Sequence, residues 1–157
     1  MPEQPEFDRT LRGARAAAAA GRTDEWVHEF LSSGLGMNQP MAIGLRKQRR
    51  WWIGPVQVRL DSLTRICGPE PEMPYRTSQE SWEEHVSGIM TVDAELLPPI
   101  IIEYRGQAPM GLHDGSHRHE ARRRRGAASI WALIWCNTES DFLEAQPIYR
   151  STEATGP

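Results

Sequence analysis

Paired cysteines and long apolar runs are both missing from this 157-residue chain. Its two cysteines, Cys67 and Cys136, stand far apart and form no Cys-x-x-Cys pair. This excludes a disulfide scaffold and a zinc ribbon, and it favours a reducing compartment. The alanine run from Ala16 to Ala20 is too short and too weakly apolar for a signal peptide or a membrane span. We therefore expect a cytoplasmic protein that does not enter a membrane.

A large excess of one charge is also lacking. The net charge is -3, hydrophobic residues make up 39% of the chain and charged residues 25%. This composition is ordinary for a globular protein, so any binding of nucleic acid would have to come from a local basic patch. The chain is long enough to bury the core of one domain with an appendage.

Residues 1–54 are expected to form a helical appendage. A first, alanine-rich helix can extend up to Gly21, and Thr23 is a plausible N-cap for a second. Asn38 is expected to open a third, short helix that ends in the basic segment Arg46 to Arg50. The appendage could pack on the main domain or form a homodimer contact, and its basic end could touch phosphates.

Residues 55–136 alternate between strand and helix patterns. Buried or half-buried strands are expected at Val56–Leu60, Ile100–Ile102, Leu112–Asp114 and Ile130–Trp135. Thr77 and Glu80 form a capping-box pattern for the helix between the first two strands, and Gly126 is expected to end the helix between the last two. The C-terminal tail, residues 137–157, is expected to add one helical turn that packs Phe142.

The most informative segment is a strand that runs through a glycine turn into a helix. Asp114 and Gly115 form the turn, and the helix would open at Ser116 or His117. Such a turn points unpaired backbone N–H groups and the positive end of the helix dipole at one place, which makes an anion-binding site that commonly takes phosphate. Asp114 could hold a metal or accept a proton, His117 could titrate near neutrality, and Arg118 could grip a phosphate.

The segment from Cys67 to Arg76 is too rich in proline for the interior of a helix or strand, so we expect a stiff loop. It presents Glu70, Glu72 and Arg76, which could line a second side of the site. A solvated acidic loop is an equally good interpretation of the same residues.

The order of these parts resembles the ParB/sulfiredoxin superfamily over residues 55–136. The resemblance rests on the signature turn Asp114-Gly115-Ser116-His117-Arg118 and on the order of strands and helices around it. Sulfiredoxins carry a nucleophilic cysteine where this chain has Ser116, and partition proteins carry an acidic residue there. The Asp-Gly-x-His-Arg pattern is most similar to free serine kinases and other ParB-like phosphotransferases.

This resemblance implies an α+β fold in which a small mixed sheet with flanking helices follows the helical appendage. It further implies a nucleotide, ATP or ADP with CTP as another possibility, and Mg²⁺. Asp114 and His117 would contact the transferred phosphoryl group or its metal, and Gly115 to Arg118 would surround the phosphates, with Arg76 nearby. A carboxylate of the preceding loop would be the base for the hydroxyl of a small-molecule acceptor; Glu72 is preferred over Glu70 because it stands nearer Arg76.

A nucleotide-binding, DNA-associated regulator without catalysis on small molecules is the alternative. Arg122 to Arg125 together with Arg46 to Arg50 could meet DNA phosphates. The net charge of -3 argues against this alternative, and so does the lack of a helix-turn-helix pattern after residue 136.

Overall fold

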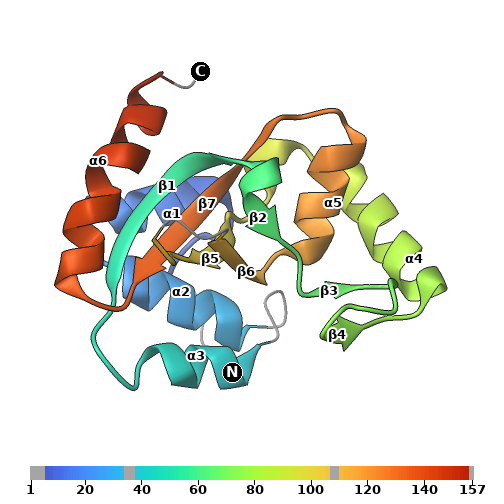
Figure 1. The fold of residues 1–157 in the computed structure, drawn as a ribbon, viewed down its shortest axis with the longest axis horizontal. Helices are drawn as coiled ribbons and strands as arrows, with labels where there is room; N and C mark the ends of the chain where they lie inside the picture. The colour runs from blue at the N-terminus through green and yellow to red at the C-terminus, as the bar shows by residue number, and fades with distance from the viewer. Residues whose placement is uncertain (1–5, 34–37, 107–109, 156–157) are drawn as a thin grey trace.

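The protein has an α+β fold, in which N-terminal helices precede a mixed five-stranded sheet with flanking helices (Figure 1). The computed structural model describes residues 6–33, 38–106 and 110–155, with side chains up to residue 149. The helices are α1 (Leu11–Ala19), α2 (Thr23–Ser32), α3 (Gln39–Leu45), α4 (Gln79–Met90), α5 (Ser116–Arg124) and α6 (Glu139–Thr155). Two 3-10 turns are η1 (Leu60–Ser62) and η2 (Ala94–Leu96).

The sheet has the strand order β1-β7-β5-β6-β2. Its strands are β1 (Trp51–Arg59), β2 (Leu63–Thr64), β5 (Ile100–Glu103), β6 (Met110–Asp114) and β7 (Ser129–Cys136). β7 pairs antiparallel with β1 and parallel with β5, and β6 pairs antiparallel with β5 and parallel with β2. A separate parallel pair joins β3 (Cys67–Gly68) to β4 (Tyr75–Arg76).

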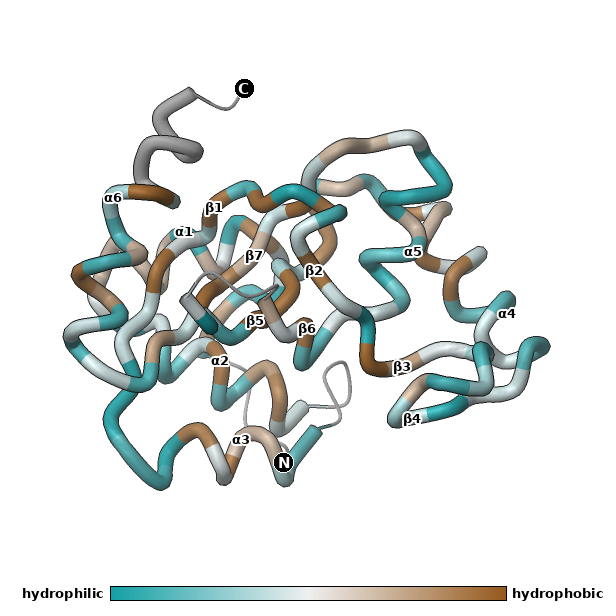
Figure 2. The backbone as a smooth tube through the Cα atoms, in the orientation of Figure 1, coloured by the Kyte–Doolittle hydropathy of each residue, from teal (hydrophilic) through white to brown (hydrophobic). Residues whose placement is uncertain are grey.

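The central strands β5 and β7 are buried on both faces. Ile100 and Ile102 belong to the core that also includes β1 and Ala145 of α6, whereas Ile101 belongs to the core formed with α1, α2 and α3. Double coverage explains why these two strands read as continuous apolar runs instead of alternating ones. Figure 2 shows the contrast between these hydrophobic strands and the hydrophilic helix α5.

The N-terminal helices share a core with the sheet. Trp26 and Phe30 of α2 stack with ring centroids 5.1 Å apart, in the same cluster as Leu133 and Trp135 of β7. This agrees with an appendage that packs on the main domain, while the homodimer contact stays a prediction. No helix in the described part of the chain combines the length and the apolar composition that crossing a membrane requires.

The strand expected from Val56 begins earlier, at Trp51, and so it passes through residue 54. Trp51 packs against the cluster that includes α6, and Trp52 packs against the cluster of the N-terminal helices. Adjacent residues of a strand point to opposite faces, and this explains why the two tryptophans part. The register shifts between Ile53 and Val56, and a Cβ at Gly54 would lie 2.6 Å from the carbonyl oxygen of Ala132.

Four other expectations on local structure were wrong in detail. The N-cap of α2 is Arg22, one residue before Thr23, and the N-cap of α4 is Ser78, whose hydroxyl accepts a hydrogen bond from the N–H of Ser81. The proline-rich loop begins and ends in the β3–β4 pair. The tail forms the long helix α6 instead of one turn, although Phe142 packs on the core as expected.

Candidate functional site

The signature turn joins β6 directly to α5. Asp114 ends the strand, Ser116 begins the helix, and Gly115 between them has a φ of 118°. A Cβ at this position would press into Ile100 and would lie 2.9 Å from Nη2 of Arg118. Only glycine fits both the backbone conformation and the space, so this turn requires the residue that the sequence has.

The start of α5 has no side-chain cap. Gly115 is the N-cap residue, and its carbonyl oxygen accepts a hydrogen bond of 2.8 Å from the N–H of His119, which closes the first helical turn. The N–H groups of Ser116, His117 and Arg118 lie in the first turn, where no carbonyl oxygen of the same helix is available to accept their hydrogen bonds. The helix start therefore has the geometry of a backbone anion-binding site.

Asp114 and Arg118 bind each other across this turn. Nη2 of Arg118 donates to Oδ2 of Asp114 at 2.6 Å, and Nη1 donates to the carbonyl oxygen of Pro98 at 3.3 Å. The Arg118 residue is only 8% exposed, and its guanidinium lies over the ring of Phe30 at 5.6 Å. Both Nη nitrogens are thus engaged within the protein, and the arginine stabilises the turn from inside.

His117 lies in an aromatic setting formed with α4. Its ring centroid is 4.6 Å from that of Trp82 and 5.1 Å from that of His85. Burial lowers the pKa of His117 below its ordinary value of 6.5, and the nearby His85 and Arg118 lower it further. The imidazole is therefore neutral at pH 7 and can donate one hydrogen bond and accept one.

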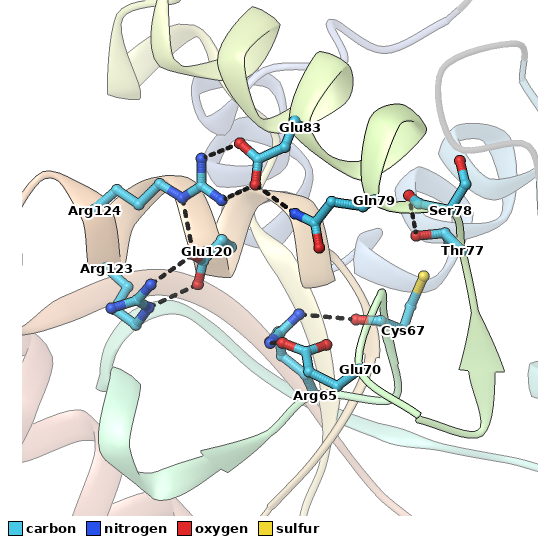
Figure 3. Close-up of polar contacts among 10 residues, drawn as sticks. All are labelled: Arg65, Cys67, Glu70, Thr77, Ser78, Gln79, Glu83, Glu120, Arg123 and Arg124. Carbon is cyan, nitrogen blue, oxygen red and sulfur yellow. Dashed lines mark hydrogen bonds and ion pairs between the residues drawn. The ribbon is translucent and has the colours of Figure 1, made fainter. Parts of the chain in front are cut away.

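Arg65 links the proline-rich loop to this aromatic setting, and Figure 3 shows its contacts with Cys67 and Glu70. The Arg65 guanidinium lies 4.7 Å over the ring of Trp82, donates to the carbonyl oxygen of Cys67 at 3.2 Å and forms an ion pair with Glu70. Glu70 is consequently tied to the same tryptophan that His117 contacts. Burial raises the pKa of the Cys67 thiol, which makes it a poor nucleophile at neutral pH.

Glu72 and Arg76 do not pair in the described structure. Arg76 donates from Nε to the carbonyl oxygen of Pro69 at 3.3 Å, and both Glu72 and Arg76 are exposed. The reason for preferring Glu72 over Glu70 is therefore absent, since the arginine that was expected to hold Glu72 in place binds a backbone oxygen. Of the two carboxylates, Glu70 is the one that a described cation holds.

The arginine run of α5 is largely engaged within the protein. Glu120 accepts two hydrogen bonds from Arg123, at 2.7 and 2.6 Å, and one from Arg124 at 2.8 Å (Figure 3). Arg124 also binds Glu83 of α4 at 2.8 and 2.7 Å. Hydrogen bonds from Arg123 and Arg124, against the effect of burial, lower the pKa of Glu120 to about 2.

The two other arginines of this run bind backbone oxygens. Arg122 donates to the carbonyl oxygen of Ser129 at 3.3 and 3.1 Å, and Arg125 donates to that of Met90. These contacts join α5 to β7 and to the end of α4. A run that reads as a basic patch in the sequence thus serves in large part to hold the helices together.

Sequence reasoning missed the part of the site that comes from outside the turn. Arg65, Trp82 and the exposed His85 were not expected near His117. Trp82 and His85 stand three positions apart and so share a helix face, which is the one local signal that could have linked them. Nothing local linked either of them to His117. No protein-family model matches this chain, and a search of curated proteins gives no match.

Proposed function

We propose that this chain is a nucleotide-binding protein of the ParB/sulfiredoxin type that transfers a phosphoryl group to a hydroxyl of a small molecule. ATP or ADP is the proposed donor, with CTP as the other nucleotide to test. The observation that carries the proposal is the uncapped start of α5, placed by Gly115 directly after Asp114. Its backbone N–H groups would bind the terminal phosphates.

Mg²⁺ fits this site in a limited way. Oδ2 of Asp114 is engaged by Arg118, which leaves Oδ1 as the oxygen for a metal. No group of three or more acidic, histidine or cysteine side chains that could hold a metal occurs in the described residues. Magnesium is often held by one or two carboxylates together with phosphate oxygens, so Asp114 would hold it only jointly with the nucleotide.

Phosphoryl transfer demands positioning more than covalent help from the protein. The acceptor oxygen would form a bond to the terminal phosphorus as the bond to the leaving phosphate oxygen breaks, and a carboxylate would take the hydroxyl proton. We keep Glu72 and Glu70 as the two candidates for that base, and the ion pair with Arg65 favours Glu70. His117, being neutral, would donate a hydrogen bond to a phosphate oxygen instead of a positive charge.

Calorimetric titration tests the nucleotide site. ATP, ADP and CTP are each titrated with and without Mg²⁺, first into the wild-type chain and then into His117→Phe. We expect saturable binding that Mg²⁺ strengthens and that His117→Phe weakens by about tenfold, because phenylalanine keeps a ring but loses one hydrogen bond to a charged group. Glu84→Gln, on the exposed side of α4, is the matched control and should leave the affinity unchanged. If none of the three nucleotides binds at millimolar concentration, the proposed function is wrong.

Catalysis is tested separately by phosphorus NMR of ATP with mixtures of amino acids, sugars and nucleosides. A new phosphate ester that depends on the protein identifies the acceptor class, and Glu70→Gln and Glu72→Gln then decide which carboxylate is the base. Binding without any ester would favour the regulatory alternative over the phosphotransferase. In that case a DNA titration at two salt concentrations should reveal salt-sensitive binding.

A further inference from the structure

A large cavity of the described structure lies away from the signature turn. It has a volume of about 710 Å³ and is lined by residues of α1, α2, α3, β1 and α6 and of the loop before β1. β1 is an edge strand, and β7 and β5 separate it from β6, which leads into the turn. The cavity and the turn are therefore two different places on the molecule.

The cavity carries an uncompensated positive charge. Arg46, Arg49 and Arg50 line it, and none of them forms an ion pair with a carboxylate of the described residues. Arg50 is fixed by neutral acceptors, since it donates to the carbonyl oxygens of Leu45 at 3.3 Å and Gly44 at 3.2 Å and to the side chain of Asn137.

Asp24 is the one carboxylate among the lining residues of this cavity. Three guanidinium charges less this one carboxylate leave two positive charges in the lining. An anion that carries two negative charges, as a phosphate monoester does near neutral pH, would balance them.

Aromatic side chains lie beside these arginines. Arg49 lies over the ring of Trp51 at 4.6 Å, and Trp52 and Phe142 also line the cavity. Tryptophan faces and guanidinium planes both stack on flat rings. The lining also includes His28, whose Nδ1 is a buried polar atom without a hydrogen-bond partner among the described residues.

We propose that this cavity binds a phosphate monoester that carries a heteroaromatic ring, of the size of a nucleoside monophosphate. Arg46 and Arg49 would bind the phosphate, Arg50 would add its fixed charge, and the ring would stack on Trp51 or Trp52. The volume falls within the range of roughly 300–1,000 Å³ that is usual for small-ligand pockets. The proposal does not depend on the function proposed for the Gly115 turn, which would take a polyphosphate on backbone N–H groups.

AMP is the probe for the test, with adenosine and inorganic phosphate as its two halves. Binding is followed by calorimetry and by quenching of tryptophan fluorescence. We expect AMP to bind more tightly than either half, since one half lacks the charge and the other lacks the ring. Arg49→Glu should weaken AMP binding by about tenfold or more, as expected when an attractive charged contact becomes repulsive. Arg46→Glu should act in the same direction.

The chain offers a matched control in Lys47→Glu. Lys47 is exposed in the same basic segment and undergoes the same change of charge, but it does not line the cavity. It should leave AMP affinity within about twofold, because charges that far into solvent are screened. Arg46, Lys47 and Arg49 are all exposed, so the three variants should fold, which circular dichroism checks.

Three results would overturn the proposal. The first is that AMP binds no better than inorganic phosphate, and the second is that Lys47→Glu weakens binding as much as Arg49→Glu. Either result would mean that the basic segment attracts anions without a specific site. A single-stranded oligonucleotide that binds where AMP does not would make the surface a nucleic-acid groove instead. His117→Phe separates the two sites, because it should lower the affinity at the signature turn and leave the effect of Arg49→Glu on AMP unchanged.

Discussion

Replacing Gly115 by alanine should destabilise the fold far more than an alanine at another glycine of positive φ. At Gly115 the φ is 118°, and the new methyl group would press into Ile100, a residue of zero exposure in the central strand β5. It would also lie 2.9 Å from Nη2 of Arg118, which donates to Asp114. Backbone strain and overpacking therefore act together at this position.

The magnitude follows from these two effects. A non-glycine residue in a left-handed conformation costs about 1–3 kcal/mol, and overpacking a filled core costs about 1–3 kcal/mol more. Gly115→Ala should therefore lower the free energy of unfolding by about 3–5 kcal/mol. Gly21 has a φ of 71°, and a Cβ added there would meet nothing within 4 Å, so Gly21→Ala carries the strain alone and should cost about 1–2 kcal/mol.

Urea unfolding followed by circular dichroism measures both variants on one scale. The informative quantity is the difference between them, which should be about 2–3 kcal/mol. If Gly115→Ala loses no more stability than Gly21→Ala, then β5 does not press against the turn, and the account of why this turn requires glycine fails. An equal loss would also remove the reason to expect a rigid start of α5.

Three further predictions concern the surroundings of α5. Burial lowers the pKa of His113, His117 and His119 below 6.5, so near and below that pH the unfolded chain binds more protons than the folded chain does. The free energy of unfolding should therefore fall as the pH drops from about 7 to about 5. A flat pH profile would contradict this expectation. Glu120→Gln should lower the free energy of unfolding in urea by about 1–2 kcal/mol, which is less than the loss of a fully buried ion pair, because Arg123 is 62% exposed. In the wild-type chain, the stabilisation that comes from the ionised Glu120 carboxylate should be lost only as the pH falls from 4.5 to about 2. Trp82→Ala should lower the free energy of unfolding by about 3–5 kcal/mol. It should also raise the pKa of His117 toward 6.5, which an NMR titration measures, because it exposes the imidazole. An unchanged pKa would mean that Trp82 does not bury this ring.

Local patterns were enough to predict much of the fold. The apolar runs of β5 and β7 and the glycines that flank α5 each specify one structure, because burial on two faces and a backbone turn leave few alternatives. Patterns failed where two neighbours offer the same chemistry, as Thr77 and Ser78 do at the start of α4. They also failed for β3 and β4, whose two-residue ladder has no period to detect.

The candidate site likewise combines contacts that local spacing predicts with contacts that it does not. The contact of Asp114 with Arg118 spans four residues of one turn, so their spacing predicts that they can meet. The contacts of His117 with Trp82 and of Trp82 with Arg65 join segments that are far apart in the chain, and only the packing of α5 against α4 and β3 brings them together. Arg65 and Glu70 are only five residues apart, but they lie in a segment without a regular period, so the sequence could not decide between this pair and Glu72 with Arg76.

The two basic runs show why charge counted along a sequence is a weak guide to binding. In α5, Glu120 and Glu83 lie within hydrogen-bond distance of Arg123 or Arg124, and a protein carboxylate there already occupies the place that a phosphate would take. Before β1, Arg50 binds only carbonyl and amide oxygens, which fix its position but do not neutralise its charge. In the first run Arg122 and Arg125 are likewise bound by carbonyl oxygens alone. The two runs look alike in the sequence, but two guanidinium groups of the first form ion pairs within the protein, whereas none before β1 does so among the described residues. What distinguishes them is which side chains the fold brings opposite each guanidinium, and that is also why the cavity beside β1 and the turn at Gly115 call for separate experiments.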